Sequence, residues 1–125
     1  MQDVRPRFLN LTQIKFPITA IASICQRISG VALFLGIPII LYYLQLSLSS
    51  INEFNAIVAC IDQCSLVRLA IGAYILALVY HVIGGIRHLI MDIGFLEELP
   101  MAKFTATATF VLTLAVMAVV GMWLW

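Results

Sequence analysis

Three long apolar stretches decide what this chain can fold into. They span residues 28–48, 66–91 and 104–125. Each is long enough to form a helix of about 20 residues, which is the length needed to cross the hydrocarbon core of a bilayer. The third stretch carries no charge, and the second carries a few ionisable groups, namely Arg68, His81, Arg87 and His88. The pattern predicts an all-α integral membrane protein with three transmembrane helices, the first kinked at Pro38.

The composition excludes several classes of protein. Hydrophobic residues make up 63% of the chain and charged residues only 10%, whereas soluble domains carry about 25% charged residues. A soluble fold of this length could not bury so much apolar surface. A net charge of +1 gives no electrostatic footprint for nucleic acid, so no nucleic-acid partner is expected. Three cysteines exclude a disulfide-dense scaffold. Cys60 and Cys64 could form a disulfide or remain free thiols.

The basic residues predict the orientation in the membrane. The segment 1–27, an arm that ends in a short helix from Pro17 onward, is basic, and the connection 92–103 contains Lys103. The connection 49–65 contains neither lysine nor arginine. The positive-inside rule then places the N-terminus and 92–103 in the cytoplasm and 49–65 outside, in an up-down-up topology. The first 16 residues lack the features of a signal peptide, so we expect the mature chain to start near Met1.

His81 is the ionisable side chain expected deepest in the membrane, where such groups are costly and often functional. It belongs to a helical stripe in which every other member is small or a histidine: Ala70, Ala73, Ala77, Gly84 and His88. Such a stripe lets another helix or a flat macrocycle approach closely. Two interpretations follow. His81 could form a hydrogen bond across an ordinary helix packing, or it could be an axial ligand to haem iron.

The two histidines of the chain cannot bind the same iron. His81 and His88 are seven residues apart, which is about 10.5 Å along a helix axis. A haem with two histidine ligands would therefore take its second ligand from a different subunit. His88 could meet a haem propionate, or it could be a simple interfacial histidine.

Ser23 and Arg27 form a second candidate site. They are four residues apart and share a helix face. A hydroxyl and a guanidinium can together donate to one carbonyl oxygen or anion, which suits a quinone head group or a propionate. Alternatively, Arg27 only anchors the span, and Ser23 caps or packs. Near the end of the second span, we expect Asp92 to form a local ion pair with Arg87.

The segment from His81 to Gly94 reads H-x3-G-x-R-H-x3-D-x-G, and it resembles a signature of the cytochrome b subunit of succinate dehydrogenase. Arg5-Pro6, Ser23, Arg27 and Ser29 resemble the first signature of the same family. The resemblance covers nearly the whole chain. Two positions depart from the pattern, because Gln26 stands where the family commonly has a histidine and Arg7 replaces an apolar residue. Glutamine can donate a hydrogen bond but cannot carry a proton charge.

The resemblance implies a non-catalytic subunit of the succinate dehydrogenase complex in the bacterial inner membrane. Such a subunit anchors a flavoprotein subunit and an iron–sulfur subunit to the lipid bilayer. Electrons from succinate reach ubiquinone at the interface between the iron–sulfur subunit and the two membrane subunits. A second membrane-anchor subunit shares a haem b and supplies its other ligand. By position, His81 matches the axial haem ligand, Ser23 and Arg27 match the quinone site, and Arg27 and His88 match the propionate contacts.

Three other functions remain open from the sequence. The chain could anchor a quinol:fumarate reductase, which runs the reaction in reverse. It could be a small proton-conducting or transporter subunit that uses His81 as a relay. It could also be a purely structural anchor, in which electron transfer to quinone does not depend on His81.

Overall fold

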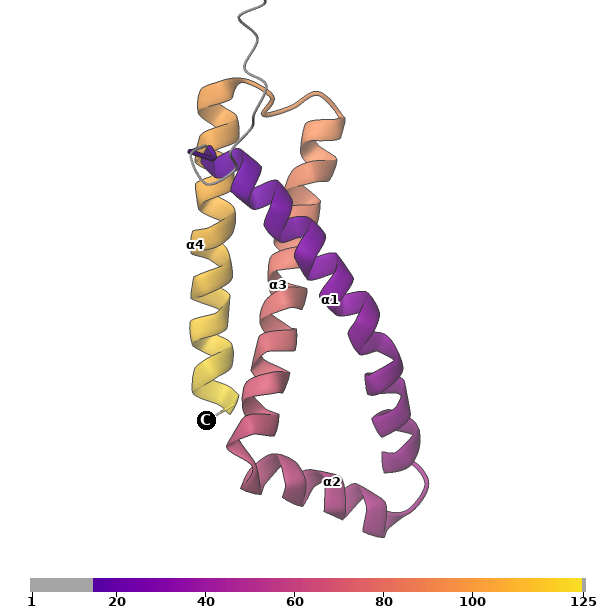
Figure 1. Ribbon diagram of the computed structural model, residues 1–125. Coiled ribbons are helices and arrows are strands. Elements are labelled where there is room, and N and C mark those ends of the chain that lie inside the picture. The colour runs from indigo at the N-terminus through magenta and orange to yellow at the C-terminus, as the bar shows by residue number, and fades with distance from the viewer. Residues whose placement is uncertain (1–14, 125) are drawn as a thin grey trace, which may run out of the picture.

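The structure is a computed structural model that describes residues 15–124, so Arg5, Pro6 and Arg7 lie outside the described part. It consists of four helices, which are α1 (Ile18–Ser47), α2 (Ile51–Gln63), α3 (Ser65–Asp92) and α4 (Leu99–Leu124). Helices α1, α3 and α4 are each long and apolar enough to cross a membrane. Figure 1 shows these three running the length of the molecule, with α2 bridging the ends of α1 and α3. The predicted all-α, multi-pass membrane fold is confirmed.

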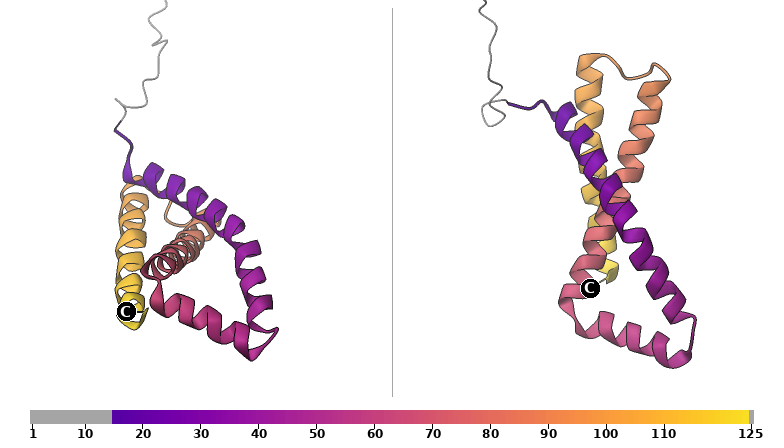
Figure 2. Two further views of the ribbon diagram at one scale, coloured as in Figure 1. Left: turned by 60° about the horizontal axis from the view of Figure 1, so that its bottom comes forward. Right: turned by 45° about the vertical axis from the view of Figure 1, so that its right-hand side comes forward.

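Helix α1 is longer than the span expected from hydropathy. The short helix expected before residue 28 and the span after it form one continuous helix, because apolar residues continue back to Ile18 and no glycine or proline interrupts them before Gly30. Pro17 is its N-cap, in an extended conformation. Pro38 lies inside the helix without ending it. Figure 2 shows the axis changing direction in the second half of α1, as expected where a proline removes a backbone hydrogen bond.

The connection between the first two spans contains the helix α2. The side chain of Ser50 accepts a hydrogen bond from the backbone N–H of Glu53 at 3.2 Å, which caps the start of the helix. At the other end, Nε of Arg68 donates to the carbonyl of Ile61 at 3.1 Å, and Nη2 donates to the carbonyl of Asp62. Arg68 thus satisfies carbonyls at the end of α2, where a helix lacks intrahelical partners. Cys60 in α2 and Cys64, which lies between α2 and α3, are free thiols.

Gly94 lies just after the end of α3, and its conformation explains why a glycine stands at this position of the sequence pattern. Its φ of 86° lies in the left-handed region, which glycine adopts without strain. Its N–H donates to the carbonyl of Met91 at 2.9 Å, and the N–H of Phe95 donates to Ile90 at 3.3 Å. This pair of bonds is a Schellman motif. Helix α4 begins shortly afterwards at Leu99, rather than at residue 104 as expected.

Small side chains form the contact between the long helices. The buried face of α4 is a row of alanines and threonines, namely Ala102, Ala106, Thr109 and Thr113. The hydroxyls of Thr109 and Thr113 donate to carbonyls one turn back at 2.9 and 2.8 Å, so they need no water. Among the described residues, large apolar side chains lie mostly on the outside of the helix bundle. This distribution is typical of membrane helices, which pack through small residues and expose large ones to lipid.

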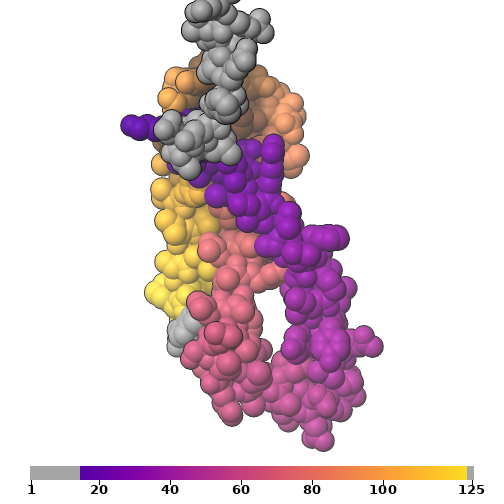
Figure 3. All heavy atoms as spheres, in the orientation of Figure 1, coloured from indigo at the N-terminus to yellow at the C-terminus, as the bar shows by residue number. Residues whose placement is uncertain are grey.

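The three spans are not packed equally along their length. Helix α3 packs against both α1 and α4. Toward α2, however, α1 and α3 diverge, and the space-filling view shows an opening between them (Figure 3). The close contact between α1 and α3 begins at Tyr74, whose ring lies against Gly36 and whose hydroxyl donates to the carbonyl of Leu33, and it continues away from α2 to include His81.

A histidine held between two membrane helices

The side chain of His81 on α3 faces α1, where two polar residues meet it. The hydroxyl oxygen of Ser29 lies 3.0 Å from Nδ1 of the imidazole, and Nε2 of Gln26 lies 3.3 Å from the same atom. Gln26 Nε2 also donates to the backbone carbonyl of His81 at 3.0 Å. Ser29 is linked to Gln26 in turn, because its hydroxyl donates to the Gln26 carbonyl at 2.9 Å. In residues 15–124, the imidazole makes its hydrogen-bond contacts through Nδ1.

Glycines provide the room for this contact. A Cβ atom added to Gly30 would lie 3.0 Å from Cε1 of His81, so the imidazole rests almost directly on the α1 backbone. On α3, a Cβ atom added to Gly84 would overlap Oε1 of Gln26, and one added to Gly85 would lie 3.4 Å from Gln26 Nε2. The two helices can approach this closely only where these side chains are absent.

The small-residue stripe on α3 therefore serves helix packing at Gly84. Gly84 is buried under the side chain of Gln26, so helix α1 occupies this part of the stripe. Ala70 and Ala73, at the end near α2, are exposed where α1 has diverged. His88 lies two turns beyond His81 on α3 and is partly buried.

Ser23 and Arg27 lie beside the contact between α1 and α3. Arg27 is exposed and Ser23 is partly buried. Successive helical residues are rotated by about 100°, which turns Arg27 away from the face that Gln26 presents to α3. The structure therefore brings His81 together with Gln26 and Ser29, and leaves the Ser23–Arg27 pair accessible on a neighbouring face.

Arg87 is held by α4, so the expected ion pair with Asp92 is wrong. Arg87 is only 7% exposed, whereas Asp92 is exposed. The Nε of Arg87 donates to the hydroxyl of Thr105 at 3.1 Å, and its Nη2 donates to the carbonyl of Ala102 at 3.1 Å. A charge inside a span turns toward the bundle interior, where backbone and hydroxyl oxygens replace water. The contact fastens α3 to α4 about two turns from His81.

Tyr80, the residue before His81, contacts both other spans. Its hydroxyl donates to the carbonyl of Ala22 on α1 at 2.9 Å. Its ring packs against Phe110 on α4, with ring centroids 5.4 Å apart. His81 thus stands on a segment fixed from two sides, which is the arrangement that a well-defined binding group needs. Sequence spacing did not identify Tyr80, Gln26 or Ser29 as parts of this site; the available signal was that Gln26 and Ser29 share a helix face with the apolar Ala22.

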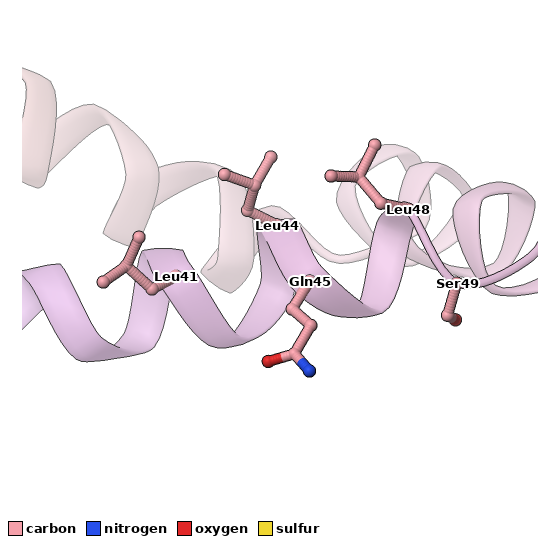
Figure 4. Close-up of a pocket in the computed structure, with 5 residues that line it drawn as sticks. All are labelled: Leu41, Leu44, Gln45, Leu48 and Ser49. Carbon is pink, nitrogen blue, oxygen red and sulfur yellow. The ribbon is translucent and has the colours of Figure 1, made fainter.

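Two surface hollows lie away from His81. One, of about 630 Å³, is at the end of α1 and is lined by Leu41, Leu44, Gln45, Leu48 and Ser49. Figure 4 shows the leucines pointing to one side and Gln45 and Ser49 to the other, so no polar groups converge there. A second, of about 220 Å³, lies between α3 and α4 and includes Arg87. Neither is lined by His81, Ser23 or Arg27.

The surroundings of His81 suit a single metal bond made through Nε2. Histidines that bind metals usually donate the other ring N–H to an oxygen, which fixes the tautomer and the ring orientation. Ser29 offers such an oxygen to Nδ1. Within residues 15–124 there is no group of three or more His, Cys, Asp or Glu side chains that could hold a metal ion by themselves.

Three apolar helices, with a fixed histidine between two of them, define a multi-pass helical membrane protein. Residues 1–120 match the family model of the succinate dehydrogenase/fumarate reductase transmembrane subunit, and the chain belongs to this family.

Relatives in three bacteria agree with this assignment. The chain is 36% identical to the succinate dehydrogenase cytochrome b556 subunit of Coxiella burnetii over 125 residues, which is the full length of both proteins. It is 37% identical to the subunit of that name from Paracoccus denitrificans over 109 residues, 83% of this chain and 79% of the other. For Rickettsia conorii the identity is 33% over 101 residues, 81% and 77% of the two chains.

Proposed function

We propose that this chain is the cytochrome b membrane-anchor subunit of a succinate dehydrogenase, and that Nε2 of His81 is one axial ligand of a haem b. The observation that carries the proposal is the fixed imidazole, whose Nδ1 contacts Ser29 and Gln26 while Nε2 has no hydrogen bond within the described residues. The names of the relatives support the haem, because each is called a cytochrome b556 subunit.

The same proposal requires partners. His88 cannot reach the same iron, so a second membrane-anchor subunit supplies the other axial ligand. An iron–sulfur subunit and a flavoprotein subunit bind on the cytoplasmic side of the bacterial inner membrane. The N-terminus and the α3–α4 connection face that side, according to the positions of the basic residues.

The residues of this chain would bind the haem propionates and the quinone by different groups. When bound, the haem supplies a one-electron redox centre. Arg27 and His88 offer positive charge or hydrogen bonds to its propionates. Ser23 and Arg27 donate to a carbonyl oxygen of ubiquinone, which favours the negative charge that develops there as the quinone is reduced. Their accessibility supports this role, because a quinone pocket at a subunit interface needs side chains that the chain itself does not bury.

The family also includes anchors of fumarate reductases, so a quinol:fumarate reductase is the second candidate. The names of the relatives favour succinate oxidation. Comparing succinate:quinone with quinol:fumarate turnover in the purified complex would separate the two directions.

A spectrum tests the haem assignment. The complex that co-purifies with this chain from native membranes is expected to show b-type Soret and α bands after dithionite reduction, at one haem per copy. His81→Ala should remove or strongly alter this spectrum, and Val82→Ala, a change at the exposed neighbouring residue, should not. A complex that oxidises succinate without haem would refute the role of His81. Absence of both haem and succinate oxidation would refute the assignment to succinate dehydrogenase and favour the proton relay.

A further inference from the structure

We propose that Ser29 is the positioning residue that orients His81 for metal binding, by accepting a hydrogen bond from its Nδ1–H. The inference rests on the proposed function, because it concerns the ligand role of His81. In the resulting chain of bonds, His81 donates to the Ser29 hydroxyl, and the hydroxyl donates to the backbone carbonyl of Gln26. This fixes the tautomer that leaves the lone pair of Nε2 available.

The donor and acceptor inventory supports this direction. A serine hydroxyl has one hydrogen to donate and two lone pairs that accept. The Gln26 carbonyl, 2.9 Å away, can only accept, so it takes the serine hydrogen. The 3.0 Å contact to Nδ1 is then satisfied by a proton on Nδ1. A histidine that binds iron through Nε2 carries its proton on Nδ1, so the two requirements agree.

Gln26 cannot replace Ser29 as the acceptor. Its amide nitrogen lies 3.3 Å from Nδ1 and only donates, so with the proton on Nδ1 this contact is not a hydrogen bond. The orientation of the amide is fixed, because Nε2 donates to the His81 carbonyl at 3.0 Å. Turning the amide over would place two carbonyl oxygens against each other. Gln26 Oε1 points the other way, toward Gly84, and is buried without a hydrogen-bond partner in the described residues.

Ser47 provides a matched control on the same helix. Its hydroxyl donates to the carbonyl three residues earlier, Leu44, at 2.8 Å, as the hydroxyl of Ser29 does toward Gln26. Ser47 is the last residue of α1, and its hydrogen bond is exposed. Changing either serine to alanine removes the same local bond, but only Ser29→Ala removes the acceptor for His81.

The test is a redox titration and an electron paramagnetic resonance spectrum of the haem in the whole complex. An acceptor on Nδ1–H makes the imidazole a stronger donor to the metal, so its loss should destabilise the oxidised haem. We expect Ser29→Ala to shift the midpoint potential to more positive values, to alter the g values of the haem and to weaken haem retention about 10-fold. Ser29→Thr, which keeps a hydroxyl, and Ser47→Ala should resemble the wild type.

Three outcomes would overturn the inference. The first is a wild-type potential and wild-type g values in Ser29→Ala. The second is a shift in Ser29→Thr as large as that in Ser29→Ala, because the hydroxyl would then not be the cause. In both cases the wild-type haem would still support the proposed function. A wild-type complex without haem would refute the proposed function itself, and the inference with it.

Discussion

Nδ1 of His81 lies 3.0 Å from the hydroxyl oxygen of Ser29, a residue 52 positions earlier in the chain. The contact joins α1 and α3 inside an apolar bundle, where a polar group without a partner is costly. It also sets the chemical state of the one imidazole that the proposed function depends on.

Gly30→Ala should disturb the histidine without weakening the helix. The new Cβ would lie 3.0 Å from Cε1 of His81 and push the ring from its place. Alanine also favours an interior helical position over glycine by about 1 kcal/mol, so α1 itself should not be destabilised. We expect altered haem absorption and a shifted potential in a complex of unchanged thermal stability. Gly121→Ala is the control, because a Cβ there meets no atom within 4 Å. Equal spectra for all three proteins would contradict the prediction.

Gly84→Ala should displace the Gln26 amide and break its bond to the His81 carbonyl. The added Cβ would overlap Oε1 of Gln26, and the loss of one buried hydrogen bond costs about 1 kcal/mol. A double-mutant cycle with Gln26→Ala measures the coupling, with thermal unfolding in detergent as the readout. The effect of Gly84→Ala should shrink when Gln26 is already alanine. Additive effects would show that the two side chains do not interact.

Arg87→Lys should destabilise the chain far more than Asp92→Asn does. The planar guanidinium reaches Thr105 and Ala102 with two different nitrogens, and a lysine ammonium cannot reproduce this fork. Losing hydrogen bonds from a buried charge costs about 1.5–3 kcal/mol. A change at exposed Asp92 should stay within about 0.5 kcal/mol. Thermal unfolding of both variants tests the order, and a larger loss in Asp92→Asn would restore the local ion pair.

Arg27→Ala should slow quinone reduction selectively. Removing one donor that stabilises developing charge lowers kcat by about 10²–10³-fold in other enzymes. Succinate oxidation with an artificial acceptor that takes electrons before the quinone site should be unaffected. Lys103→Ala removes another exposed cation from the side expected to be cytoplasmic and serves as the charge control. Wild-type quinone turnover in Arg27→Ala would remove this residue from the proposed site.

The sequence predicted what depends on local pattern. The three spans follow from hydropathy alone, and His81 stood out because an ionisable group inside a span is rare. The start of α2 could also have been predicted, because Ser50 and Glu53 have the spacing of a capping box. From the sequence, we instead expected a simple connection over residues 49–65.

The contacts between helices could not be predicted in this way. Arg87 was paired with Asp92 because they are close in sequence, yet its acceptors lie 15 and 18 residues away on α4. The phase of a single helix shows which residues share a face, but not which face meets which helix. For the same reason, Ser29 was noted only as part of a pattern and not as a neighbour of His81.

The divergence of α1 and α3 bears on how this subunit is assembled. Only Ala22, Tyr80, Ala102 and Ala106 form a buried apolar core within the described residues. The spans are thus stable mainly through the bilayer and can insert first as independent helices. Their narrow end already holds the imidazole in place, while the wide end stays open to neighbouring chains or lipids. We therefore expect the ligand geometry to be set early in biogenesis, and the outer half of the subunit to take its final shape from its neighbours.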